Sequence, residues 1–194
     1  SGELEITSNA EETNSLLRHG PLQVAAERRH LQHADGTPFL WLGDTWWMGL
    51  CRRLEWPDDV RDLTDDRAQK GFNVVHLVAG LYPDMDPFDE RGAGDGGFPW
   101  AKDFSTVNPA YFEAADLRIS HLVRNGLVPR VVGFWGFFLD VAGAEKLKEH
   151  WRYLIARWGA YPVVWCVAGE ALMPFYTSEA AKEMRRRRFE GEPW

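Results

Sequence analysis

The sequence is poor in cysteine. Its 194 residues include only two, Cys51 and Cys166, which lie in unrelated contexts. Cys166 falls inside an apolar segment, and neither residue belongs to a Cys-x-x-Cys pair. This pattern excludes a disulfide framework and a cysteine-based zinc site. We expect two free thiols, which favour the reducing cytoplasm.

Long hydrophobic runs are missing as well. No apolar run approaches the roughly 18 residues of a membrane-spanning helix, and the N-terminus lacks the basic start and apolar core of a signal peptide. We therefore expect no membrane partner. A cytoplasmic location is favoured, and a secreted or periplasmic location with the signal removed is the alternative.

Positive charge is in deficit. The 22 Lys and Arg residues against 29 Asp and Glu residues give a net charge of −7. Nucleic acids and anionic membranes require clustered cations, so both are disfavoured as partners. The one basic run, Arg185 to Arg188, lies in a predicted helix, and we interpret it as a solvated helix face.

Nucleotide-binding motifs are also absent. The first predicted parallel strand is followed by Gly43-Asp44-Thr45-Trp46-Trp47 instead of the GxGxxG fingerprint, and there is no Walker A sequence. The glycines between Arg91 and Gly97 lie in a long loop and open no helix. These absences disfavour an enzyme that binds a dinucleotide or a nucleoside triphosphate.

Tryptophan, in contrast, is abundant. The chain has ten, and several lie within or just beyond predicted strands or in a long loop. Aromatic side chains at strand ends are typical of a sugar-binding cleft, because the C–H face of a sugar packs against an aromatic ring. Those predicted to lie near a ligand are Trp46, Trp47, Trp100 and Trp135. The competing interpretation, that tryptophan is large and buries well, is preferred for the others.

Apolar segments alternate with helix signals along the chain. Short antiparallel strands are expected between Leu22 and Phe39, around the turn-forming residues 34–37. Four apolar strands follow, at residues 38–45, 72–80, 127–136 and 163–170. The helices are predicted over residues 57–70, 108–124 and 144–158, and from Ser178 onward.

This alternation indicates an α/β fold with a parallel sheet and right-handed crossovers. An open doubly wound sheet and the first half of a (β/α)8 barrel of TIM type both fit it. We choose the barrel, in which the strand-end residues Asp44, His76, Trp135 and Glu170 converge on one face. Residues 21–194 then supply an N-terminal hairpin and the first four βα units. Residues 1–20 are expected to form a loosely packed N-terminal arm.

Glu170 ends the apolar strand at residues 163–170. Barrels place their chemistry at the carboxyl ends of strands, which makes Glu170 a candidate catalytic carboxylate. A helix cap or a partner of an arginine is the alternative role. Asp44 ends the first parallel strand in the same way. His76 is either a ligand of sugar hydroxyls or a hydrogen-bonded core histidine.

Four segments resemble the DUF4038 group, the apiosidase-like glycoside hydrolases related to glycoside hydrolase family 140. They are residues 33–47 (HADGTPFLWLGDTWW), 70–75 (KGFNVV), 108–112 (NPAYF) and 163–170 (VVWCVAGE). The resemblance runs from about Gly20 to about Met184. It implies a (β/α)8 barrel that hydrolyses side chains of plant or microbial polysaccharides without a cofactor.

The resemblance also implies roles for residues. By its position at the end of the fourth barrel strand, Glu170 corresponds to the acid/base of the family, and Asp44 to a pocket residue that binds sugar hydroxyls. The family's nucleophile lies on a later strand, and the sequence ends before strands five to eight. A complete barrel needs roughly 250 residues. We therefore expect the N-terminal half of a longer enzyme, whose partner is a C-terminal half-barrel or a second copy of the chain.

The predicted function is a glycoside hydrolase that acts on polysaccharide side chains or oligosaccharides by two-carboxylate catalysis. Glu170 is its predicted catalytic residue. The predicted substrate-binding residues are Asp44, Trp46, Trp47, His76, Trp100 and Trp135. We expect no metal, and we expect the isolated chain to be inactive because the second carboxylate lies elsewhere. The alternative is a non-catalytic carbohydrate-binding or scaffold subunit derived from a glycosidase barrel.

Overall fold

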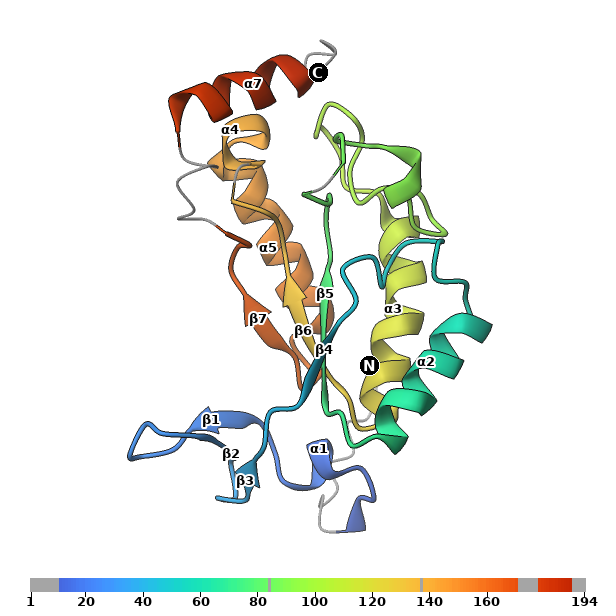
Figure 1. The fold of residues 1–194 in the computed structure, drawn as a ribbon, viewed down its shortest axis with the longest axis vertical. Coiled ribbons are helices and arrows are strands. Elements are labelled where there is room, and N and C mark those ends of the chain that lie inside the picture. The colour runs from blue at the N-terminus through green and yellow to red at the C-terminus, as the bar shows by residue number, and fades with distance from the viewer. Residues whose placement is uncertain (1–10, 84, 137, 171–177, 190–194) are drawn as a thin grey trace, which may run out of the picture.

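The computed structural model describes residues 11–83, 85–136, 138–170 and 178–189, which form two sheets and a layer of helices (Figure 1). The first sheet is antiparallel, with β1 (Leu22–Val24), β2 (Leu31–His33) and β3 (Pro38–Phe39) in that order. The second is parallel, with the order β4 (Gly43–Thr45), β5 (Val74–Val78), β6 (Val128–Val132) and β7 (Val164–Cys166). The predicted α/β class with a parallel sheet is confirmed.

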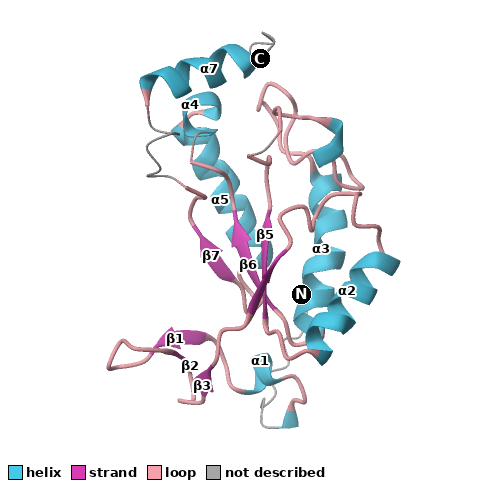
Figure 2. Cartoon of the chain, in the orientation of Figure 1, coloured by secondary structure: helices cyan, strands magenta, loops and turns pink. Residues whose placement is uncertain are grey.

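Helices connect the parallel strands (Figure 2). The three connecting helices are α2 (Asp58–Gln69), α3 (Pro109–Arg124) and α5 (Ala144–Trp158). The shorter or peripheral helices are α1 (Ser15–Arg18), the 3-10 helix η2 (Glu90–Gly92), α4 (Phe138–Ala142) and α7 (Glu179–Phe189). The predicted alternation of strands and helices is therefore present from β4 to β7.

The ends of α3 follow local sequence signals. The Asn108 side chain accepts a hydrogen bond from the Ala110 amide (3.2 Å), and Pro109 occupies the first turn, where its missing N–H leaves no bond unmade. At the other end Asn125 caps the helix, and Gly126 takes a positive φ of 76°. The predicted end at Arg124 is confirmed.

The two faces of the parallel sheet differ. Val75, Leu77 and Val131 are buried against α3 and α5 and form the main core with Phe112 and Leu154. Alternate residues point to the other face because the side chains of a strand alternate. His76 and Arg130, which are neighbours in the β5–β6 register, contact each other on that face.

The antiparallel sheet lies at the amino ends of the parallel strands (Figure 1). Phe39 of β3 and Leu16 of α1 pack with Val74 and Val128, the first residues of β5 and β6. The N-terminal segment therefore covers one end of the parallel sheet. Of the expected N-terminal arm, residues 11–20 are described: most are exposed or half-buried, but Leu16 is buried and the Asn14 side chain donates to the Val123 carbonyl (2.6 Å).

The apolar run at residues 38–45, which we expected to be one strand, is divided between the two sheets. Asn73 explains the break. Its side chain accepts a hydrogen bond from the Leu42 amide (2.9 Å) and donates to the Leu40 carbonyl. In a continuous strand the Leu42 amide and the Leu40 carbonyl would pair with a neighbouring strand. Here they bond to the Asn73 side chain instead, where the chain passes from β3 into β4.

The parallel sheet has two open edges among the described residues. β4 pairs only with β5, and β7 pairs only with β6. A closed barrel is therefore not present in the part of the chain that the structure describes.

Candidate active site

Four of the predicted residues come together on one side of the parallel sheet, three of them beyond the carboxyl ends of the strands and His76 in the middle of β5. Trp47 follows β4, His76 lies on β5, and Trp135 and Glu170 follow β6 and β7. The Trp135 indole N–H donates to Glu170 Oε2 (3.0 Å). The ring centroid of Trp47 lies 4.9 Å from that of Trp135 and 5.0 Å from that of His76. We call Trp47, His76, Trp135 and Glu170 the strand-end group.

The strand-end group is open to solvent on one side. Trp47 is 39% exposed and Glu170 is exposed, whereas Trp135 is buried. A ligand that packs on the face of Trp47 would therefore lie close to the Glu170 carboxylate, whose orientation is held by Trp135.

The backbone at Gly169 packs directly against the Trp135 ring. A Cβ on Gly169 would lie 2.5 Å from the Trp135 ring, so only glycine allows this approach. The Gly169 carbonyl accepts a hydrogen bond from the Gly136 amide (2.9 Å), and Glu170 adopts a positive φ of 48°. Non-glycine residues with positive φ are uncommon and cluster at functional sites.

Arg130 and Cys166 extend the strand-end group toward the middle of the sheet. Arg130 Nη1 lies 2.9 Å and 2.7 Å from the two ring nitrogens of His76, and Nη2 donates to Cys166 Sγ (3.3 Å). Burial, followed by the positive charge of Arg130, lowers the pKa of His76 to about 4. His76 is therefore neutral at pH 7 and accepts a hydrogen bond from the guanidinium.

Asp44 and Trp46 face the helices instead. The Asp44 carboxylate accepts hydrogen bonds from Arg67 of α2, from the Trp46 indole (3.0 Å) and from the Thr45 amide (2.8 Å). Partial burial opposes ionisation of Asp44, but these donors outweigh burial and lower its pKa. Trp46 is buried in the main core with Leu77. Both side chains are therefore engaged beside the strand-end group: Asp44 and Trp46 line one hollow with Trp47, and Asp44 lines another with His76.

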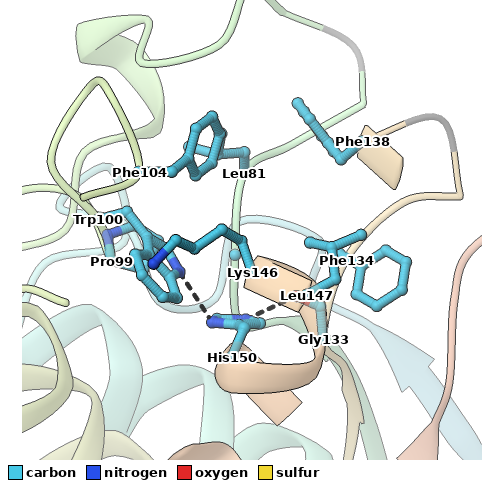
Figure 3. Close-up of a pocket in the computed structure, with 11 residues that line it drawn as sticks. Leu81, Pro99, Trp100, Phe104, Gly133, Phe134, Phe138, Lys146, Leu147 and His150 are labelled. Atoms are coloured by element: carbon cyan, nitrogen blue, oxygen red, sulfur yellow. Dashed lines mark hydrogen bonds between the residues drawn. The ribbon is translucent and has the colours of Figure 1, made fainter. Parts of the chain in front are cut away.

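Trp100 lies in a different pocket, beside His150 and Lys146 (Figure 3). It is buried, and its indole N–H donates to His150 Nδ1 (3.1 Å). The hollow beside it has a volume of about 20 Å³, which is room for one water molecule and not for a sugar. Trp100 anchors the long loop to α5.

His150 was not identified from the sequence, since a histidine on the buried face of a helix carries no distinctive spacing. Its Nδ1 accepts from Trp100, so the proton resides on Nε2, which lies 2.8 Å from the carbonyls of both Ala79 and Gly133 (Figure 3). Burial lowers the pKa of His150, and the carbonyl contacts oppose the shift. The neutral ring joins α5 to the carboxyl ends of β5 and β6.

Arg118 is a second buried residue that the sequence did not reveal. From α3 it donates to the carbonyls of Gly49 (3.1 Å) and Leu54 (2.7 Å), and to the Asp95 carboxylate (2.8 Å). The first two belong to the loop that carries Trp47, and Asp95 belongs to the long loop after β5. Arg118 therefore fixes both loops relative to α3.

No metal or membrane feature emerges from the described residues. Within them, no three His, Cys, Asp or Glu residues are grouped so as to hold a metal ion. None of the helices in the described ranges is long and apolar enough to cross a membrane.

Solved structures with a similar fold are glycoside hydrolases. One is named "Glycoside hydrolase" (TM-score 0.63, 22% identity, covering 89% of this chain and 38% of that chain). Another is a glycoside hydrolase family 5 protein from Bacteroides vulgatus (TM-score 0.62, 22% identity, 90% and 38%), and a third is a putative glycoside hydrolase from the same organism (TM-score 0.58, 20% identity, 91% and 37%). The chain spans less than two fifths of each of these proteins. The fold is thus of the glycoside hydrolase type.

The family can be stated more narrowly. The family described as "Apiosidase-like, catalytic domain" matches residues 25–193, and the chain belongs to this family. The resemblance seen in the sequence is thereby confirmed. No curated protein matches the chain.

Proposed function

We propose that this chain carries the acid/base carboxylate of a glycoside hydrolase, Glu170. The observation that carries the proposal is the 3.0 Å hydrogen bond from the Trp135 indole to Glu170 Oε2, at the carboxyl end of a parallel sheet. Active sites of parallel barrels lie at this end. The family and the glycoside hydrolase fold support the same activity.

In this mechanism Trp135 orients the carboxyl group of Glu170, and Glu170 transfers the proton. Trp135 occupies one carboxylate oxygen, which leaves Oε1 of Glu170 to meet the glycosidic oxygen. Glu170 protonates the departing oxygen and, in a reaction that retains configuration, then acts as a carboxylate to activate the water that hydrolyses the glycosyl intermediate. A second carboxylate attacks the anomeric carbon if the reaction retains configuration, at about 5–5.5 Å from the first, or activates water if it inverts.

The substrate class follows from Trp47. Its exposed ring offers a face on which a sugar packs, and His76 lies beside it as a neutral hydrogen-bonding group. We assign polysaccharide side chains or oligosaccharides as the substrates, bound with the sugar on Trp47 and the scissile bond toward Glu170.

We also propose that the sheet is the first half of a (β/α)8 barrel, completed by further polypeptide that supplies the second carboxylate. The two open edges at β4 and β7 support this proposal, and so do the whole glycoside hydrolases of similar fold, of which the chain spans 37–38%. On this basis the isolated chain is inactive.

The test is the substitution Glu170→Gln in the assembled enzyme. We expect kcat on natural-type glycosides to fall about 10²- to 10⁴-fold, the usual contribution of a general acid. Aryl glycosides with good leaving groups need less protonation and should lose less. Glu113→Gln, which neutralises an exposed carboxylate on α3, is the matched control and should change neither rate. Full activity in Glu170→Gln would refute the assignment.

A second candidate function is glycan binding without cleavage. It is favoured by the fact that, among the described residues, Glu170 is the one carboxylate in the strand-end group. Oligosaccharide binding, measured by tryptophan fluorescence, separates the two. Binding by the assembled protein with no hydrolysis of any glycoside would favour the non-catalytic subunit.

A further inference from the structure

Arg130 carries a positive charge on the sheet face that α3 and α5 do not cover. It lies in the middle of β6, in register with His76 and Val164. Its contacts are the neutral His76 ring and the Cys166 sulfur, which is a weak acceptor. Among the described residues no carboxylate forms an ion pair with Arg130: Asp44 pairs with Arg67, and Glu170 accepts a hydrogen bond from Trp135.

The surroundings of Arg130 form a polar belt between two apolar layers. Toward the amino ends, Val74 and Val128 pack under the antiparallel sheet. Toward the carboxyl ends, Val78 and Val132 are buried by the long loop. Between these layers Thr45, His76 and Arg130 border an open hollow of about 420 Å³, which Trp41 and the ion-paired Asp44 also line.

If another segment covers this hollow, the positive charge of Arg130 needs an anion beside it. Burying a guanidinium against apolar groups is strongly unfavourable unless an opposite charge accompanies it. A carboxylate is the side chain that matches the planar donors of arginine. We propose that the polypeptide segment covering this face presents an Asp or Glu carboxylate to Arg130, forming an ion pair across the interior of the completed fold. This inference rests on the proposed completion of the barrel.

A second copy of the chain fits this face less well. In a twofold dimer the same patch of each copy meets its counterpart, so an Arg130 near the twofold axis faces the Arg130 of the other copy. Like charges brought together in an interface are repelled. The charge therefore favours a different segment, one that carries a carboxylate at the level of the belt.

The first test uses propionate as the carboxylate probe on the purified chain, with ionic strength held constant by sodium chloride. We expect a saturable shift of the His76 ring NMR signals, because the anion binds beside the guanidinium that contacts them. The shift should disappear in Arg130→Met and remain in Arg53→Met, which removes an exposed positive charge. Arg130→Lys, which keeps the charge, should retain part of the response. No saturable shift in the wild-type chain would overturn the inference.

The second test is a crystal structure of the assembled protein. We expect an Asp or Glu carboxylate of the covering segment within about 4 Å of the Arg130 guanidinium, the usual limit of an ion pair. An apolar contact there would overturn the inference. So would binding of glucuronate to the assembled protein that Arg130→Met abolishes, since the anion would then belong to a ligand. In the purified chain Glu170→Gln should leave propionate binding unchanged, so a failure of the proposed catalysis is distinguishable from a failure of this site.

Discussion

Gly169 determines how Trp135 and Glu170 meet. Because the Trp135 ring occupies the space of a Cβ at this position, the indole N–H can reach the carboxylate of the next residue. The positive φ of Glu170 turns its side chain back toward the ring. A single glycine thus converts the end of a strand into an oriented carboxylate.

His76 provides a prediction that depends on charge. Its folded pKa of about 4 lies below the ordinary value of 6.5. Above pH 6.5 the residue is neutral in the folded and unfolded chains, so it has no effect on stability. As the pH falls from 6.5 to 4, the unfolded chain binds a proton that the folded chain does not, and stability is lost.

We expect an NMR titration of the His76 ring to have its midpoint near 4. Arg130→Met should raise the midpoint but leave it below 6.5, because burial is the larger cause of the shift and Arg130 the smaller. A wild-type midpoint near 6.5 would contradict the contact between Arg130 and His76.

The sequence predicted which residues lie at the ends of strands, but it did not predict the face of the sheet to which each side chain points. Trp47, His76, Trp135 and Glu170 come together because parallel strands share one carboxyl edge. Asp44 ends a strand in the same way but points toward α2, because it is in register with Val75, whose side chain lies on the face that packs against the helices. The role of Arg118 depends on contacts with residues 64 and 69 positions away, which no local pattern contains.

At the scale of elements, Asn108 joins α3 to the long loop. Its side chain caps the helix and also donates to the carbonyls of Gly96 (2.7 Å) and Phe98 (2.8 Å). The cap was predictable from the Asn-Pro-Ala sequence, whereas the two loop contacts were not. The long loop is therefore fastened at the point where α3 begins.

Two substitutions separate these roles. Asn108→Ser keeps a capping oxygen and loses the two loop contacts, so we expect the free energy of unfolding to fall by about 2 kcal/mol, at about 1 kcal/mol for each hydrogen bond. Asn108→Ala also loses the cap and should fall by about 1 kcal/mol more. Urea denaturation measures both. Equal stability of the two variants would show that the cap contributes nothing.

The helix boundaries could be predicted because their signals are local. The termini of α3 and α5 agree with the predicted ranges, and for α3 the local signals are Asn108, Pro109 and the Asn125-Gly126 stop. The division of residues 38–45 between two sheets could not be predicted, because the residue that causes it, Asn73, is more than 30 positions away.

At the scale of the whole molecule, the open edges of the sheet govern association. Val167, which follows β7, is 73% exposed and apolar. Unpaired strand edges with exposed apolar side chains promote pairing with another chain. We therefore expect the isolated chain to self-associate at micromolar concentration, through its edges.

Val167→Lys should reduce this association, because a lysine at an edge opposes pairing. Leu117→Lys, which changes an exposed leucine on α3, is the control and should have no effect. Size-exclusion chromatography with light scattering measures both variants. A stable wild-type monomer, or an equal effect of the two lysines, would argue against association through the edges.

The contact between Trp47 and Trp135 has an optical consequence. Their rings lie 4.9 Å apart with an angle of 74° between their planes. Two indoles at this distance couple their electronic transitions and produce paired bands of opposite sign in the circular dichroism spectrum. A molecule that settles on Trp47 perturbs one member of the pair while the bond to Glu170 holds the other. A change in these paired circular dichroism bands therefore reports whether a ligand occupies the candidate active site.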